Sequence, residues 1–151
     1  MIFSPIFALA LFLLTHVAHA LPPAELNTRS TTVRATFDYN YDNPSGSLNG
    51  VACSNGDHGL AAKYPMFSDL PTFPYIGGVP GASWGSPKCG GCWKLTSTTT
   101  GYWIFFTAVD GTATFNLAQP AFKALNGGQI GQGVMDLIAQ EVPRSFCGLS
   151  P

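Results

Sequence analysis

Four cysteines constrain the fold of this chain more than any other feature of its sequence. They are Cys53, Cys89, Cys92 and Cys147, and they lie downstream of a segment with the features of an export signal. An even number of cysteines in a small exported chain predicts a framework of disulfide bonds. We therefore expect two bridges. Four cysteines allow three pairings, and their positions by themselves do not choose among them.

Cys89 and Cys92 form a Cys-Gly-Gly-Cys segment, a spacing also found in redox motifs and zinc sites. A zinc site of this kind needs a second pair of ligands. No second Cys-x-x-Cys segment occurs, and His58 is the one histidine beyond the export signal. We expect no metal ion, no thiol redox chemistry and no cofactor.

Residues 1–20 have the layout of a secretory signal peptide. An uncharged apolar run over residues 6–14 is followed by Ala18-His19-Ala20, an A-x-A pattern that predicts cleavage before Leu21. The alternative, a buried N-terminal helix, lacks polar positions at helical spacing. The run is also shorter than the roughly 20 apolar residues of a transmembrane helix. We expect a secreted, extracellular protein without a membrane anchor.

The rest of the chain divides into a short leader and one domain. Residues 21–32 begin Leu-Pro-Pro and carry few large apolar side chains, so we expect a flexible leader. Residues 33–151 are enough for one hydrophobic core but not for two.

The charge of the chain excludes two classes of partner. Its 7 Lys and Arg nearly balance its 8 Asp and Glu, and no run of either sign occurs. Electrostatic binding to nucleic acid or to anionic lipid requires a basic surface. We expect neither partner.

The pattern of apolar residues predicts a mainly β domain. Strands are expected where β-branched and aromatic residues gather between turn residues, over residues 33–41, 93–99, 102–109 and, with less contrast, 134–142. A short helix is expected over residues 120–125, between Pro120 and Gly127, and a further helical turn after His58. Residues 64–87 are rich in Gly and Pro and predict an ordered loop without strands. These elements indicate a small antiparallel or mixed barrel.

Several short segments, in this order, resemble the cerato-platanin family of small secreted fungal proteins. The most specific is residues 51–60, VACSNGDHGL. The others are residues 71–74 (PTFP), 76–78 (IGG), 86–87 (SP) with Trp84 before them, 89–96 (CGGCWKLT), 109–110 (VD), 115–116 (FN) and 147–149 (CGL). The resemblance covers about residues 33–149. Its specificity comes from the coincidence of four cysteines, their spacing and their flanking residues.

The resemblance implies a six-stranded double-psi β-barrel with one or two short helices, the fold of barwin, of the first expansin domain and of some small endoglucanases. It also implies disulfides between Cys53 and Cys89 and between Cys92 and Cys147. Family members are extracellular and cell-wall associated, bind chitin oligomers, self-assemble at surfaces and elicit plant defence. In one place the chain departs from the family pattern: residues 111–114 (GTAT) are about one residue short. The resemblance therefore gives no expectation for the shape of that loop.

Asp110 is the first candidate for a functional residue, because it follows an apolar strand where burial can tune an acid. The alternative is that Asp110 and Gly111 form a turn, with the carboxylate bonded to nearby backbone amides. Asp38, which ends the segment of residues 33–38 within the first predicted strand, is the one plausible second carboxylate on a different strand, since glycoside hydrolysis usually needs two. Its alternative is a solvated aspartate that opens a polar turn.

The remaining candidates are polar and aromatic side chains suited to sugars. Asn55, Asp57 and His58 stand in a polar loop that could bond sugar hydroxyls or be simple turn chemistry. Asn116 joins the sugar-groove candidates through the resemblance. Among the rings that could stack on sugars, Trp93 and Trp103 lie in predicted strands and are expected in the core. Trp84 and Tyr75 are the expected surface rings.

Three functions compete on this sequence. We expect a non-catalytic protein that binds polysaccharide or chitin oligomers and self-associates at surfaces. The enzyme alternative is an inverting glycosidase with Asp110 as general acid and Asp38 as base, or an expansin-like protein that loosens walls. The third is an elicitor recognised by a plant host.

Overall fold

A computed structural model describes residues 29–150 of the chain. Its strands are β1 (Ser30–Phe37), β2 (Ile76–Val79), β3 (Cys92–Ser97), β4 (Trp103–Gly111), β5 (Phe115–Leu117) and β6 (Val134–Val142). The α-helix among the described residues is α1 (Gln119–Leu125). Within residues 29–150, 3₁₀ turns lie at Tyr39–Asp42, Leu48–Gly50, Phe67–Asp69 and Arg144–Cys147.

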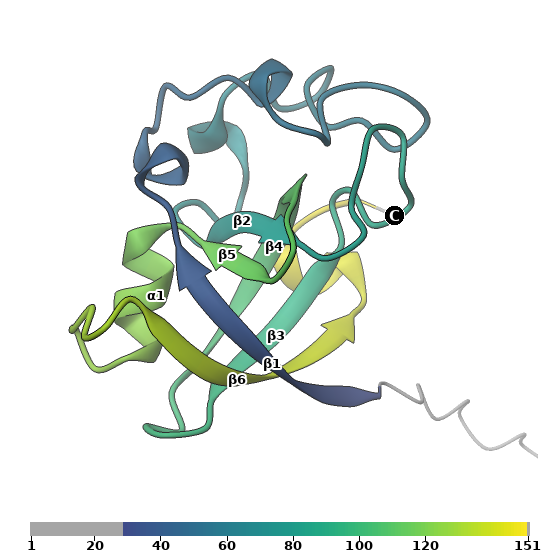
Figure 1. The fold of residues 1–151 in the computed structure, drawn as a ribbon. Helices are drawn as coiled ribbons and strands as arrows, with labels where there is room; N and C mark the ends of the chain where they lie inside the picture. The colour runs from purple at the N-terminus through teal and green to yellow at the C-terminus, as the bar shows by residue number, and fades with distance from the viewer. Residues whose placement is uncertain (1–28, 151) are drawn as a thin grey trace, which may run out of the picture.

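The strands close into a barrel in the order β1-β5-β2-β4-β3-β6. β1 with β5 and β2 with β4 are parallel pairs, whereas the other neighbours are antiparallel. Figure 1 shows β1 and β6 crossing one side of the barrel, α1 beside it, and the long segment between β1 and β2 arching over one end. The expected mainly β fold, a six-stranded double-psi barrel with a short helix, is confirmed.

The barrel interior is filled by alternate residues of its strands. Ile104 and Phe106 of β4 point inward and are buried, whereas Trp103, the first residue of β4, is 54% exposed. Leu95 of β3 and Leu137 of β6 fill the same interior. Trp103 was expected in the core, and this prediction is wrong: β4 is apolar on both faces, so its sequence does not reveal which face points outward.

The ends of the predicted strands differ from the observed ones at the start of the domain. β1 begins at Ser30, so residues 30–32 of the expected leader belong to the strand. The strand ends at Phe37, and Asp38 caps the following 3₁₀ turn by accepting a hydrogen bond from the Asn40 N–H over 2.8 Å. The predicted signal peptide and residues 21–28 lie outside the described residues. After His58 the structure has no helix, but a single α-turn lies there, in which the Tyr64 N–H donates to the Leu60 carbonyl over 2.8 Å.

Two strands, β2 and β5, were not predicted from the residue pattern. β2 lies inside the Gly-rich stretch for which we expected no strand, so that expectation is wrong. A Cβ atom on Gly77 would lie 2.1 Å from the Asn116 carbonyl oxygen, and one on Gly78 would lie 2.4 Å from the Thr112 side chain. The two glycines let β2 fit closely against its neighbours, although glycine disfavours strands by itself.

Both disulfides join the cysteines as the resemblance implied. Cys53 is bonded to Cys89 and Cys92 to Cys147, and none of the four cysteines is free. Since Cys89 and Cys92 flank the start of β3, the two bridges anchor this strand to a loop on one side and to the C-terminal 3₁₀ turn on the other. The framework therefore fixes the loops at one end of the barrel relative to its strands.

Candidate functional site

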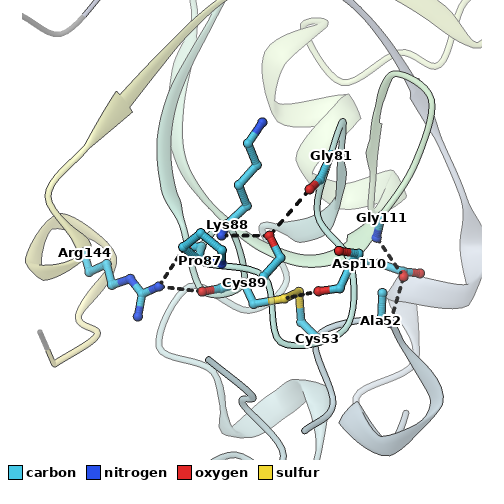
Figure 2. Close-up of a disulfide and its surroundings, with 11 residues drawn as sticks. Ala52, Cys53, Gly81, Pro87, Lys88, Cys89, Asp110, Gly111 and Arg144 are labelled. Atoms are coloured by element: carbon cyan, nitrogen blue, oxygen red, sulfur yellow. Dashed lines mark hydrogen bonds between the residues drawn. A yellow bond between two sulfur atoms is a disulfide. The ribbon is translucent and has the colours of Figure 1, made fainter. Parts of the chain in front are cut away.

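Asp110 lies near the end of β4 and accepts three hydrogen bonds. Its Oδ1 accepts the Ala52 N–H over 2.9 Å and the Gly111 N–H over 2.8 Å. Its Oδ2 accepts the hydroxyl of Tyr41 over 3.0 Å. Figure 2 shows the carboxylate between Ala52 and Gly111, next to the disulfide of Cys53 and Cys89. Asp110 thus joins three segments that are distant in sequence.

Tyr41 was not predicted as a site residue. Its side chain is buried below the groove, and the pKa of its hydroxyl is raised well above the usual value near 10. Burial is the largest cause, followed by the negative charge and hydrogen bond of Asp110 and the charge of Asp38. The hydroxyl therefore stays protonated and remains a donor to Asp110 at neutral pH.

A groove of about 300 Å³ lies above Tyr41 and Asp110. Asp38 and Asn40 line it from the 3₁₀ turn after β1, Ser47 and Gly50 from the segment that follows, and Asp110 from β4. The structure thus brings the two candidate carboxylates into one groove, although they lie at the ends of strands on different parts of the barrel.

The other predicted site residues do not line this groove. Asn116 of β5 is half-buried, and its Oδ1 accepts the Thr36 hydroxyl over 2.9 Å, which ties β5 to β1. Asn55, Asp57 and His58 are exposed in the loop after Cys53. Asn55 connects this loop to the groove, since its Nδ2 donates to Oδ1 of Asn49 over 3.4 Å.

The short loop after Asp110 is ordered by its own side chains. β4 runs to Gly111 and β5 begins at Phe115. Between them the Thr112 hydroxyl donates to the Thr114 carbonyl over 2.6 Å, and the Thr112 N–H donates to the Val79 carbonyl over 3.2 Å. Asp110 and Gly111 therefore lie in a strand and not in a turn, but the carboxylate does bond to backbone amides as the alternative interpretation proposed.

A second, larger groove of about 990 Å³ lies at the start of β4 and is rich in aromatic rings. Tyr102, Trp103 and Phe146 are each more than half exposed there, and Tyr75 is half-buried in the same groove. Trp93, by contrast, is half-buried against the core, edge-on to Phe115 with ring centroids 5.2 Å apart. Sequence reasoning missed this groove, because its rings come from segments far apart in the chain.

Among residues 29–150, no group of three or more His, Cys, Asp or Glu side chains is placed to hold a metal ion. In the same part of the chain, no helix is long and apolar enough to cross a membrane.

Comparison with known proteins identifies the family. A sequence profile described as Cerato-platanin matches residues 33–149. The chain is 35% identical over 143 residues to the heat-stable 19 kDa antigen of Coccidioides immitis, covering 91% of this chain and 97% of the relative. The crystal structure of cerato-platanin 2 from M. perniciosa superposes with a TM-score of 0.73 at 41% identity, over 79% of this chain and all of that one. The solution structure of the fungal elicitor Cerato-Platanin gives a TM-score of 0.69 at 41% identity, over 76% and 96%. This chain belongs to the cerato-platanin family.

Proposed function

We propose that this protein is a secreted, non-catalytic module that binds cell-wall polysaccharide, with chitin oligomers as ligands, through the groove at Asp110. The observation that carries the proposal is the meeting of Asp38, Asn40, Ser47 and Asp110 along one open groove. Such a row of polar groups, with the Tyr41 ring below, can bond the hydroxyl and acetamido groups of a neutral sugar.

The hydrogen bonds of the two aspartates favour binding over hydrolysis. An inverting glycosidase needs one carboxyl group to protonate the leaving oxygen and another to activate water. Asp110 already accepts three hydrogen bonds, and Asp38 holds the Asn40 N–H. Of the roughly four lone-pair positions of a carboxylate, Asp110 retains about one, which suits a sugar hydroxyl as donor.

The enzyme alternative rests on one specific observation, that Asp38 and Asp110 line the same groove. A weak glycosidase would use Asp110 as acid and Asp38 as base. An expansin-like protein would use the same groove to loosen polysaccharide chains without cleaving them.

The proposal includes the biological setting of the family. The predicted signal peptide supports secretion to the cell wall, and the nearly balanced charge of the chain favours a neutral ligand over nucleic acid or anionic lipid. The likeness to a fungal elicitor supports recognition by a plant host. The exposed rings of Tyr102, Trp103 and Phe146 support self-association at surfaces.

The test is a calorimetric titration with chitin and cellulose oligomers, run beside an assay for new reducing ends. We expect saturable binding of chitin oligomers and no release of reducing ends. Release that disappears in both Asp110→Asn and Asp38→Asn would replace the binding function with the glycosidase. No binding of either oligomer would remove the proposed function.

A further inference from the structure

Trp84 presents the most exposed large ring among the described residues, at 69%. It lies in the loop of residues 80–89 between β2 and β3, and its ring lies beside Gly56 of the loop of residues 53–60. A Cβ atom on Gly56 would lie 3.5 Å from Cε2 of Trp84. One edge of the indole is therefore close to the backbone at Gly56 while most of the side chain is exposed to solvent.

The two loops approach so closely because glycines meet between them. A Cβ on Gly56 would lie 2.8 Å from Cα of Gly85, and both glycines have positive φ angles, +87° and +69°. The disulfide of Cys53 and Cys89 ties the same two loops together. Trp84 is thus carried on a fixed support rather than on a loose loop.

Hydrogen bonds within the 80–89 loop brace that support. The Lys88 Nζ donates to the Pro80 carbonyl over 3.0 Å, and the Lys88 N–H donates to the Ser86 hydroxyl over 3.2 Å. The Ser86 hydroxyl also donates to the Gly81 carbonyl over 3.5 Å, so Gly81 and Lys88, both labelled near the disulfide in Figure 2, are joined through Ser86. An exposed ring that is already fixed loses little conformational entropy when a ligand covers it.

The Trp84 loop lies next to the groove at Asp110. Gly111, which follows Asp110, comes so close to the 80–89 loop that a Cβ on it would lie 2.1 Å from the Ala82 carbonyl oxygen. Trp84 is two residues beyond Ala82, a span of at most about 7 Å. On the other side, Asn55 beside Gly56 bonds to Asn49, the neighbour of the groove residue Gly50.

We propose that Trp84 is an aromatic subsite that stacks on a sugar ring of the same oligomer that Asp110 binds in the groove. The inference rests on the proposed function and adds to it that the ligand is a long, neutral oligosaccharide spanning both places. The apolar face of a pyranose packs on the indole, while the exposed polar side chains of Asn55, Asp57 and His58 around it face the sugar hydroxyls. These three candidates, which do not line the groove, then belong to the rim of this subsite.

The test compares oligomer lengths. Wild-type affinity for chitin oligomers is expected to rise from the disaccharide to the hexasaccharide. Trp84→Ala should bind the disaccharide as wild type does but bind the hexasaccharide about tenfold more weakly. Trp84→Phe, which keeps an aromatic ring, should lose less hexasaccharide affinity than Trp84→Ala.

Trp103→Ala is the matched control, because Trp103 is also exposed, at 54%, but lies at the opposite end of β4 in the second groove. It should keep wild-type affinity at every length. The change in tryptophan fluorescence on hexasaccharide binding should persist in Trp103→Ala and vanish in Trp84→Ala.

Two results overturn the subsite while leaving the proposed function standing. The first is an equal loss of affinity for oligomers of all lengths in Trp84→Ala. The second is a loss of hexasaccharide affinity in Trp103→Ala and not in Trp84→Ala. Wild-type protein that binds no oligomer of any length overturns both. Thermal unfolding of each variant, expected to match wild type at these exposed positions, shows that the comparison is between folded proteins.

Discussion

The hydroxyl of Tyr41 donates a hydrogen bond to Oδ2 of Asp110 over 3.0 Å, across 69 positions of sequence. This bond joins the 3₁₀ turn after β1 to the end of β4, and both of its residues line the groove. The geometry of the proposed sugar site therefore depends on one buried phenol as much as on the carboxylates beside it.

Tyr41→Phe should destabilise the protein by about 1–3 kcal/mol, because it removes a hydrogen bond to a carboxylate and leaves the ring in place. The measurement is the free energy of unfolding in urea. Tyr39→Phe is the control, since Tyr39 is 61% exposed, and should change stability by less than about 0.5 kcal/mol. Equal stability of Tyr41→Phe and wild type would show that the contact contributes nothing.

The raised pKa of Tyr41 predicts a loss of stability in alkali. Above pH 10 a tyrosine in the unfolded chain releases its proton, while buried Tyr41 in the folded protein keeps its own. The folded state then binds more protons than the unfolded state, so stability falls as pH rises. The free energy of unfolding, measured at successive pH values above 10, should fall less steeply with pH for Tyr41→Phe than for wild type. An equal slope for the two proteins would show that the pKa of Tyr41 is not raised in the folded state.

Replacing both Cys53 and Cys89 by Ala should lower the free energy of unfolding by about 4 kcal/mol. The bridge joins residues 36 positions apart, and without it the unfolded chain between them gains conformational entropy. Urea unfolding measures the loss. Before any substitution, thiol titration of the denatured, unreduced wild-type protein should give no signal. A stoichiometric thiol signal would mean that one of the two bridges is not formed.

Asp110→Asn should weaken chitin-oligomer binding by about 1–3 kcal/mol, because the amide replaces a charged acceptor that faces the groove. The measurement is calorimetric affinity for a short oligomer. Asp136→Asn serves as control, since Asp136 is exposed on β6 away from the groove, and should bind as wild type does. Unchanged affinity in Asp110→Asn would leave Asp110 with a purely structural role.

The exposed rings of the second groove predict adsorption at interfaces. Wild-type protein should lower surface tension at micromolar concentration, and the double variant Trp103→Ser with Phe146→Ser should lower it less. Trp84→Ser provides the comparison, because it also removes an exposed ring but from the other end of the barrel. Unchanged surface tension for wild type would rule out a surface-active protein.

The local sequence was sufficient to predict a helix or strand where the apolar pattern and the flanking turn residues agree. The helix after Pro120 and the strand over residues 134–142 were predicted within one residue of the observed α1 and β6. β2 and β5 escaped prediction for a physical reason. β2 contains two glycines and β5 has three residues, so their strand conformation comes from neighbours on both sides and not from their own propensity.

The site divides in the same way. The sequence identified Asp110 and Asp38 as carboxylates at strand ends, but it contained nothing to show that they share one groove or that Tyr41 lies between them. The sequence also placed Trp84 on the surface and Trp103 in the core. The prediction for Trp103 was wrong, because β4 is apolar on both faces.

The sequence by itself determined the disulfide-bonded, mainly β character of the domain, because the even number of cysteines, the apolar alternation and the turn residues are visible without knowing which segments meet. Only the tertiary structure decided which side chains meet, since contacts such as that of Tyr41 with Asp110 span 69 positions. Local propensity carries no information about such contacts. They form because closing the barrel buries the apolar faces of all six strands together.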